Sequence, residues 1–319
     1  MRDITLTERT AAAQPTEHRF DVDGLGIAYF EWAAEGNPDA AGRPVLLAHA
    51  TGFHARTWDA VSRLLPGHRV VAIDMRGHGR SDNPEPPIAW DPFGEDVAAL
   101  ARHIDLRDAI GVGHSMGGHS TTIAAALEPS RFAALLLLDP VMHGARPADA
   151  PANEGAGPDT TPREAFHFVA KRRNQWAGPQ EMVERFQDRF PYSAWAPGVL
   201  DDYARYGLAP APDGEGYALA CPPALEAAIY AAGGSGPDVA VEVVPKVRVP
   251  VRVVRARQRV PGEESAPFAT SPTRPDLASL FADGEDLLMP AMSHFIPMED
   301  PALVARQVRD LDARLDAAR

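Results

Sequence analysis

A serine stands between two glycines in the stretch VGHSMGGHS, residues 112–120. Ser115 is flanked by Gly113 and Gly117 in the pattern Gly-x-Ser-x-Gly, after an apolar stretch that predicts a strand and before one that predicts a helix. Glycines at these places let the backbone turn sharply and lift the serine hydroxyl above a sheet. The amide of Met116 then lies at a helix N-terminus, where it can stabilise an oxyanion. We predict that Ser115 is a nucleophile and Met116 an oxyanion donor.

A serine hydroxyl becomes a useful nucleophile only when a base removes its proton. Among the 11 histidines, His294 in AMSHFIPMEDP lies between the last predicted strand and the last predicted helix. A loop at that place can reach over the sheet edge toward the serine. We predict that His294 is the base, and we assign no catalytic role to the other histidines near the motifs, which are His49, His78, His114 and His119.

The elements that must position these residues alternate between strand and helix from residue 44 to residue 141. Short apolar runs are typical of strands buried on both faces, and helical spacing appears between them. The stretch HRFDVDGLGIAYFEWA alternates around a DG turn and predicts a hairpin before them. We therefore predict a mostly parallel, doubly wound α/β sheet whose buried strands are PVLLAHA, RVVAIDM, DAIGVGHS and FAALLLLDPV.

This alternation stops after residue 142. Residues 143–239 are rich in Pro, Gly and charge, show helical pieces and contain no buried-strand pattern, whereas VPVRVVRAR restores the rhythm afterwards. We predict an N-terminal tail at residues 1–18, a core at 19–142 and 240–319, and a helical cap inserted at 143–239.

Composition narrows the classes of function. The chain has 319 residues, a net charge of −13, one cysteine (Cys221) and no apolar run long enough to span a membrane. Acidic chains have little electrostatic affinity for nucleic acid or anionic membranes, and one cysteine permits no internal disulfide. Residues 1–20 lack the apolar core of a secretory signal. We expect a cytoplasmic protein without nucleic-acid or membrane partners, with a homodimer as an open alternative to a monomer.

Four motifs in this order and spacing resemble the α/β-hydrolase superfamily: LLAHATGF, DMRGHGRSD, GHSMGG and SHFIPMEDP. The resemblance spans residues 20–315, with the insertion in the place of the family's cap. It implies the α/β-hydrolase fold with a helical cap, a catalytic triad, and neither a cofactor nor a metal.

The triad acid is the point where this chain departs from many family members. They carry it after the strand that follows the cap, where this chain reads VVRARQRVPGEE and has Arg259 at the corresponding position. Asp139, at the end of LLLLDPV, is the better candidate, because some branches of the family resemble this chain in placing the acid there, and because parallel sheets place site residues at the carboxyl ends of strands. Glu263 and Glu264 remain alternatives.

The second oxyanion donor is expected after LLAHA, where the family's His-Gly-x motif appears as His49-Ala50-Thr51. The Thr51 amide is the first choice, with those of Gly52 and Phe53 as alternatives. We expect the substrate pocket to include Gly52, Phe53, His143 and Trp176. The cationic run of Lys171, Arg172 and Arg173 is interpreted as a solvated face, with an arginine that binds a polar substrate group as the alternative.

These residues together predict a cofactor-independent serine hydrolase that cleaves a carboxylic ester or lactone of a small, largely apolar molecule through an acyl-enzyme. One alternative is a carbon–carbon bond hydrolase with the same triad. Another is a receptor-like protein that binds a ligand on a hydrolase fold. Epoxide hydrolase and haloalkane dehalogenase are disfavoured, because they need a carboxylate nucleophile where this chain has Ser115.

Overall fold

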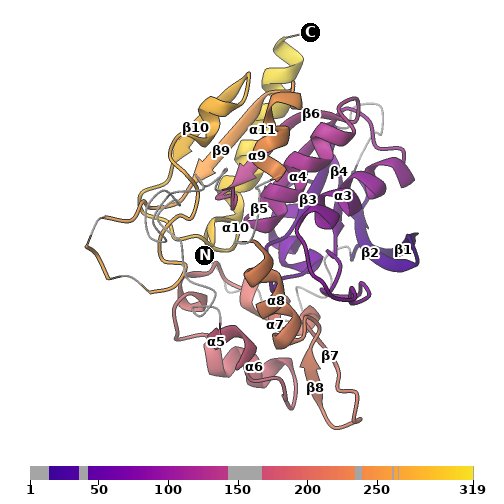
Figure 1. Cartoon of the computed structure of the whole chain (residues 1–319), viewed down its shortest axis with the longest axis vertical. Coiled ribbons are helices and arrows are strands. Elements are labelled where there is room, and N and C mark those ends of the chain that lie inside the picture. The colour runs from indigo at the N-terminus through magenta and orange to yellow at the C-terminus, as the bar shows by residue number, and fades with distance from the viewer. Residues whose placement is uncertain are drawn as a thin grey trace.

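The computed structural model describes residues 14–35, 42–142, 167–233, 239–260, 262–264 and 266–318. Its centre is an eight-stranded sheet with the order β1-β2-β4-β3-β5-β6-β9-β10 (Figure 1). The strands are β1 (Thr16–Val22), β2 (Leu25–Trp32), β3 (Gly42–Ala48), β4 (His68–Ile73), β5 (Ala109–His114), β6 (Phe132–Leu138), β9 (Val251–Arg255) and β10 (Gly284–Leu288).

The sheet is parallel from β4 to β10, and the β1–β2 hairpin joins it antiparallel to β4. The hairpin turns at Asp23 and Gly24, both with positive φ, as a two-residue hairpin turn requires. The predicted mostly parallel α/β sheet is thus confirmed. The predicted tail at residues 1–18 differs, because β1 begins at Thr16, and residues 1–13 lie outside the described part of the chain.

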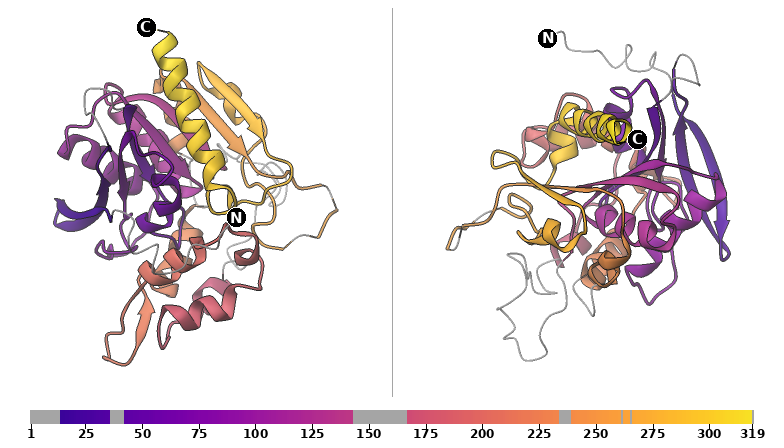
Figure 2. Two further views of the ribbon diagram at one scale, coloured as in Figure 1. Left: turned by 180° about the vertical axis from the view of Figure 1, so that it is seen from behind. Right: turned by 90° about the horizontal axis from the view of Figure 1, so that it is seen from above.

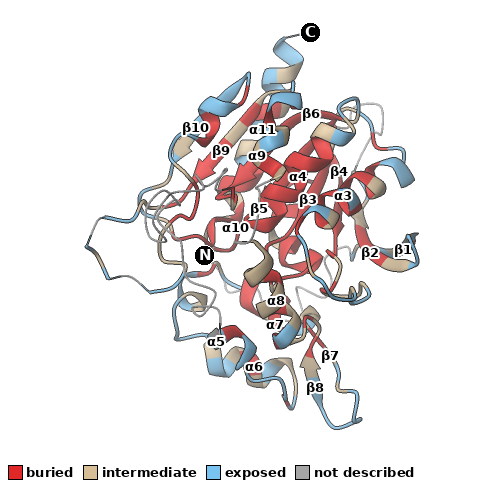
Figure 3. Cartoon of the chain, viewed as in Figure 1, coloured by how far each residue is buried: buried red, intermediate tan, exposed pale blue. Residues whose placement is uncertain are grey.

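Helices cover both faces of the sheet, because successive strand residues point to opposite sides. On one face, strand residues such as Leu46 and Leu135 pack with α3 (Asp91–His103), α4 (Met116–Leu127) and α9 (Val239–Val243). On the other face, Leu47 and Leu136 pack with α2 (Asp59–Ser62) and the long C-terminal helix α11 (Pro301–Ala317). Figure 2 shows α11 from behind, and Figure 3 shows that the buried residues concentrate in the strands and in the helix faces turned toward them.

The described part of the insertion lies beside the carboxyl ends of the strands (Figure 1). It contains α5 (His167–Ala170), α6 (Pro179–Phe186), α7 (Val199–Tyr206) and α8 (Pro223–Gly233), and a two-stranded sheet of β7 (Leu208–Pro210) and β8 (Tyr217–Leu219) that is separate from the main sheet. This hairpin was not predicted, since three-residue strands are too short to show alternation. The remaining short helices are η2 (Ala55–Trp58), η4 (Tyr192–Ala194), η5 (Val244–Lys246), η6 (Leu277–Leu280) and α10 (Ile296–Glu299).

Among the described residues, no helix has the length and apolar character that crossing a membrane demands.

Candidate active site

Ser115 occupies the turn between β5 and α4 with φ 55° and ψ −118°, a strained conformation for a residue with a side chain. The glycines around it are required by close contacts. A Cβ on Gly113 would lie 2.3 Å from the carbonyl oxygen of Gly117, and a Cβ on Gly117 would lie 2.1 Å from that of Ala48. The Gly-x-Ser-x-Gly pattern is therefore the sequence that allows this turn to pack against β3.

Ser115, His294 and Asp139 lie in one hydrogen-bonded line. His294 Nδ1 is 2.7 Å from Asp139 Oδ2, and His294 Nε2 is 3.0 Å from Ser115 Oγ. All three residues are buried. A carboxylate can only accept hydrogen bonds, so His294 Nδ1 carries a hydrogen and donates a hydrogen bond to Asp139. His294 Nε2 is then left to accept a hydrogen bond from the serine hydroxyl. The structure thus brings together the three residues that the sequence predicted as nucleophile, base and acid.

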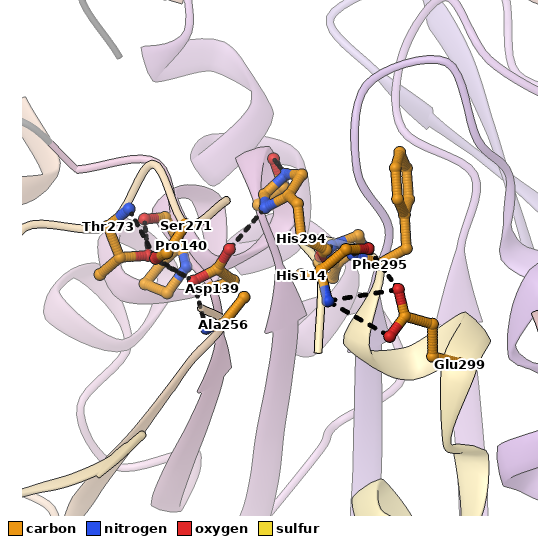
Figure 4. Close-up of polar contacts among 11 residues, drawn as sticks. His114, Asp139, Pro140, Ala256, Ser271, Thr273, His294, Phe295 and Glu299 are labelled. Atoms are coloured by element: carbon orange, nitrogen blue, oxygen red, sulfur yellow. Dashed lines mark hydrogen bonds and ion pairs between the residues drawn. The ribbon is translucent and has the colours of Figure 1, made fainter. Parts of the chain in front are cut away.

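Asp139 is held by its second oxygen as well (Figure 4). Oδ1 accepts hydrogen bonds from the Ala256 amide at 2.9 Å, from the Thr273 hydroxyl at 3.2 Å and from the Ser271 hydroxyl. These donors come from the chain after β9. They fix the plane of the carboxylate, so Oδ2 points at His294.

The alternative acids lie elsewhere. Glu263 forms an ion pair with Arg257 at 2.9 Å, and Arg257 holds the pKa of that carboxyl below its usual range. Glu264 is exposed. Arg255 is also engaged, through a two-pronged contact with Asp286 at 2.6 and 2.7 Å. Neither arginine is thus without a counter-charge, and the chain between β9 and β10 contributes three hydrogen-bond donors to Asp139.

The His294 backbone is fixed from two sides. Its carbonyl oxygen accepts a hydrogen bond from His114 Nε2 at 2.8 Å, and its amide donates to the Phe268 carbonyl at 3.1 Å. Burial and then the proximity of His294 lower the pKa of His114 well below its ordinary value, so this ring is neutral near pH 7. His114 thus has a positioning role next to the serine.

Two backbone amides remain candidates for holding an oxyanion. Met116 is the first residue of α4, so its amide has no acceptor within the helix. The Thr51 hydroxyl donates to Met116 Sδ at 3.3 Å, which places the Thr51 loop against the start of α4. The other two candidate amides are engaged: Gly52 donates to His78 Nε2 at 3.0 Å and Phe53 to the Ala50 carbonyl at 3.2 Å. The geometry favours Thr51 and Met116.

Buried histidines shape the loop that carries Thr51. His49 Nε2 accepts from the Met75 amide at 3.0 Å, while its Nδ1 donates to the Ala50 carbonyl at 2.8 Å. His78 donates from Nδ1 to the Arg76 carbonyl at 3.0 Å, which leaves its Nε2 free to accept from Gly52. Burial is the main cause that lowers the pKa of His78 to about 4 and that of His49 well below its ordinary value. Both rings are neutral acceptors near pH 7.

A pocket lies between this loop and the cap. It is lined by Gly52, Phe53 and His54 from the core and by Arg172, Tyr203 and Leu219 among the cap residues. The Phe53 ring lies 5.3 Å from that of Tyr203 and 6.0 Å from that of Phe295, the residue after His294. Phe53 therefore contacts both the pocket wall and the segment that carries the triad histidine.

Among the predicted pocket residues that the structure describes, Trp176 does not line it. Trp176 is 2% exposed and packs within the cap, with its ring 5.6 Å from that of Phe186 and under the guanidinium of Arg173. The prediction for Trp176 is corrected, because the aromatic side chain stabilises the cap itself. His143 lies outside the described residues. In the sequence, Arg172 is one of three consecutive cationic residues, and nothing in that run distinguishes it from Lys171 and Arg173 as a pocket residue.

The α/β sheet, the Ser115 turn and the order of the motifs together indicate the protein family to which this chain belongs. Residues 45–307 match the model of the alpha/beta hydrolase family, and the chain belongs to that family. Solved structures share the fold over nearly the whole chain. E-2-(acetamidomethylene)succinate hydrolase has a TM-score of 0.69 at 20% identity and covers 93% of this chain and 98% of its own. The peroxisomal alpha-beta-hydrolase of Saccharomyces cerevisiae has a TM-score of 0.71 at 16% identity, covering 96% and 91%.

Curated relatives are similar over part of their length. The chain is 37% identical over 150 residues to a non-heme chloroperoxidase of Streptomyces lividans, which is 45% of this chain and 49% of that protein. It is 34% identical over 197 residues to a non-heme haloperoxidase of Rhodococcus erythropolis, which is 58% of this chain and 66% of that protein. It is 30% identical over 171 residues to a bifunctional esterase/perhydrolase of Acinetobacter calcoaceticus, which is 49% of this chain and 57% of that protein. The matches thus span about half to two thirds of these relatives.

Proposed function

We propose that this protein is a cofactor-independent serine hydrolase that cleaves a carboxylic ester or lactone through an acyl-enzyme. The observation that carries the proposal is the buried line from Ser115 Oγ through His294 to Asp139, with contacts of 3.0 and 2.7 Å. A strained serine that contacts a histidine, whose other ring nitrogen contacts a buried carboxylate, is the arrangement that serine hydrolysis requires.

The acylation step follows from the contacts. Ser115 Oγ attacks the carbonyl carbon of the substrate as His294 Nε2 takes the hydroxyl proton, and Asp139 stabilises the imidazolium that forms. The carbonyl oxygen becomes an oxyanion that the amides of Thr51 and Met116 hold. When the intermediate collapses, the bond to the alcohol oxygen breaks and His294 returns its proton to that oxygen. The alcohol leaves and the acyl group stays on Ser115.

Deacylation repeats these steps with water. His294 Nε2 takes a proton from a water molecule as the water oxygen attacks the acyl carbon. The amides of Thr51 and Met116 also hold the second oxyanion, and the collapse of this intermediate breaks the bond between the acyl carbon and Ser115 Oγ. His294 gives its proton to the serine, a carboxylic acid is released and the starting state is restored. For a lactone the alcohol and acid are parts of one product.

The proposed substrates are esters and lactones because an alcohol leaves more readily than an amine. A relative named as an esterase supports the same bond class. The acyl-enzyme is open to other nucleophiles, since hydrogen peroxide in place of water would yield a peracid. The names haloperoxidase and perhydrolase among the relatives justify testing that nucleophile separately.

A fluorophosphonate probe combined with a panel of chromogenic esters and lactones tests the proposal. We expect one label per chain, on Ser115, and ester turnover that Ser115→Ala abolishes. Hydrogen peroxide is added in a separate arm, with peracid as the readout. Undiminished labelling of Ser115→Ala contradicts the nucleophile. A labelled protein that turns over a diketone but no ester or lactone contradicts the bond class and favours carbon–carbon hydrolysis.

A further inference from the structure

The pocket contains a charged group that the reaction steps above do not use. Among the described residues that line it, Arg172 is the one with a formal charge, since burial lowers the pKa of His54 to about 3. Arg172 Nη1 donates to Glu226 Oε2 at 2.5 Å, and Nη2 donates to the Tyr203 hydroxyl at 2.8 Å. The Glu226 side chain is 5% exposed and that of Arg172 is 21% exposed. The Arg172 side chain thus lines the pocket and is partly exposed, while its counter-charge is covered.

This ion pair lies directly against the oxyanion loop. A Cβ on Gly52 would be 2.3 Å from Glu226 Oε1, so the carboxylate fills the space that a side chain at this position would need. Tyr230, one turn further along α8, reaches the Thr51 carbonyl at 3.4 Å. The ion pair and Tyr230 thus border the loop whose Thr51 amide is proposed to hold the oxyanion.

The guanidinium retains donors for a ligand. Arginine presents five N–H groups, and within the described part of the chain Glu226 and Tyr203 are the groups recorded as accepting from Arg172. Its charge, however, is already cancelled by Glu226. A second carboxylate from a substrate would be buried beside Glu226 with one cation between the two anions, and the desolvation of the added charge would lack full compensation. An uncharged acceptor meets no such penalty.

We propose that Arg172 binds an uncharged hydrogen-bond acceptor of the substrate, a carbonyl or ether oxygen remote from the scissile bond, and that Glu226 discriminates against a carboxylate at the same place. The inference rests on the proposed function, because it concerns the substrate of the Ser115 site. It assigns the pocket a polar recognition point, and it makes Glu226 a determinant of substrate charge.

The test uses three chromogenic esters of equal chain length whose far end is an alkyl group, a methyl ketone or a carboxylate. Two series carry the end group on the acyl side or on the alcohol side, since either side can face Arg172. For the wild type we expect the ketone to exceed the alkyl ester in kcat/KM by roughly tenfold to hundredfold in one series, the range for a hydrogen bond to a charged donor. The carboxylate is expected to be the poorest of the three.

Two variants separate the roles of the pair. Glu226→Gln keeps an acceptor for Arg172 and removes the negative charge, so the ratio of carboxylate to ketone kcat/KM should rise by at least about tenfold. Arg172→Met combined with Glu226→Gln removes both charges without leaving one buried alone, so the ketone should lose its advantage over the alkyl ester. Arg173→Gln is the matched control, because Arg173 pairs with Glu181 outside the pocket, and its ratios should equal those of the wild type.

The outcomes distinguish this inference from the proposed function. Equal kcat/KM for ketone and alkyl esters in both series, with turnover still dependent on Ser115, overturns the role of Arg172 and leaves the hydrolase intact. A wild type that prefers the carboxylate overturns the role of Glu226. An unchanged carboxylate-to-ketone ratio in folded Glu226→Gln does the same. If that variant does not fold, the wild-type rank of the carboxylate ester tests Glu226, and the double variant tests Arg172 through the ketone advantage. Absence of any ester turnover contradicts the proposed function instead.

Discussion

At the scale of single residues, Asp139 uses its two carboxylate oxygens differently. Oδ2 faces His294, whereas Oδ1 accepts from Ala256, Ser271 and Thr273. Asp139→Asn places an amide where a carboxylate must accept, so the histidine adopts the wrong tautomer. In the serine protease template, which provides this magnitude, that change costs about 10⁴ in kcat. We expect Asp139→Asn to fold and to lose roughly three to four orders of magnitude in kcat on its best ester.

Glu263→Gln is the matched control for that variant, because Glu263 lies on the post-cap loop and pairs with Arg257 rather than with His294. Its kcat should stay within a few-fold of the wild type. The assignment of Asp139 is contradicted if Asp139→Asn keeps most of its activity, or if Glu263→Gln shows the larger loss.

The sequence predicted Ser115 and His294 from motif order, and it favoured Asp139 from its place at a strand end while Glu263 and Glu264 stayed open as acids. It was insufficient to predict what holds them. Ser271 and Thr273 contact Asp139 across more than 130 residues of chain, and no local pattern marks them. Similarly, the choice among the amides of Thr51, Gly52 and Phe53 depends on an acceptor, His78, that belongs to a different loop.

At the scale of elements, the turn between β5 and α4 depends on close backbone contact with β3. Gly117→Ala would place a Cβ 2.1 Å from the Ala48 carbonyl oxygen, and neither backbone can move without disturbing the sheet. We expect a loss of at least about 3 kcal/mol in the free energy of unfolding, at the upper end for overpacking. Gly67→Ala is the control, since nothing lies within 4 Å of its Cβ, and it should change stability by less than about 0.5 kcal/mol. Urea unfolding measures both, and equal effects contradict the explanation.

The loop that carries Thr51 is held by neutral histidines, which makes the fold sensitive to acid. Burial is the main cause that lowers the pKa of His78 to about 4 and of His54 to about 3, from 6.5. Below about pH 6.5 the unfolded chain takes up protons that the folded protein does not, so the unfolding free energy falls as pH falls toward 4. Asp74, whose pKa burial raises to about 6, opposes this with a smaller shift.

We therefore expect the unfolding free energy to drop by at least about 2 kcal/mol between pH 7 and pH 4.5, measured by urea unfolding at each pH. His78→Gln keeps an acceptor for the Gly52 amide without a titrating ring, so its stability should depend less steeply on pH. A stability that is flat or rises over this interval contradicts the account.

Strands could be predicted from the sequence where their apolar or alternating patterns were long. Apolar runs predicted the buried strands β3 to β6, and a DG turn predicted the β1–β2 hairpin. The strands β7 and β8 could not be predicted in this way, since they are stabilised by contacts within the cap. The Trp176 amide and carbonyl both bond to Tyr217 beside this hairpin. The same contacts bury Trp176 in the cap and away from the pocket, which sequence spacing alone did not reveal.

At the scale of the whole molecule, the net charge of −13 acts on any charged substrate before it reaches the pocket. The field of the protein repels anions at low ionic strength and is screened over about 10 Å at 0.1 M salt. We expect kcat/KM for a carboxylate-bearing ester to rise roughly twofold to tenfold from about 20 mM to about 500 mM NaCl. A neutral ester of the same length should be insensitive to salt. A fall in kcat/KM for the anionic ester contradicts the expectation.

The proposed nucleophile Ser115 and the proposed acid Asp139 directly follow the adjacent strands β5 and β6 and precede the insertion, whereas the proposed base His294 follows it. Arg172 and Glu226, in contrast, belong to the insertion itself. Recombination between relatives after Asp139 and before β9 would therefore exchange the residues proposed to recognise a substrate, while Ser115, Asp139 and His294 stay with their original parent. Chimeras built at these two junctions would inherit reactivity from one parent and selectivity from the other, which makes the insertion a natural unit for directed evolution.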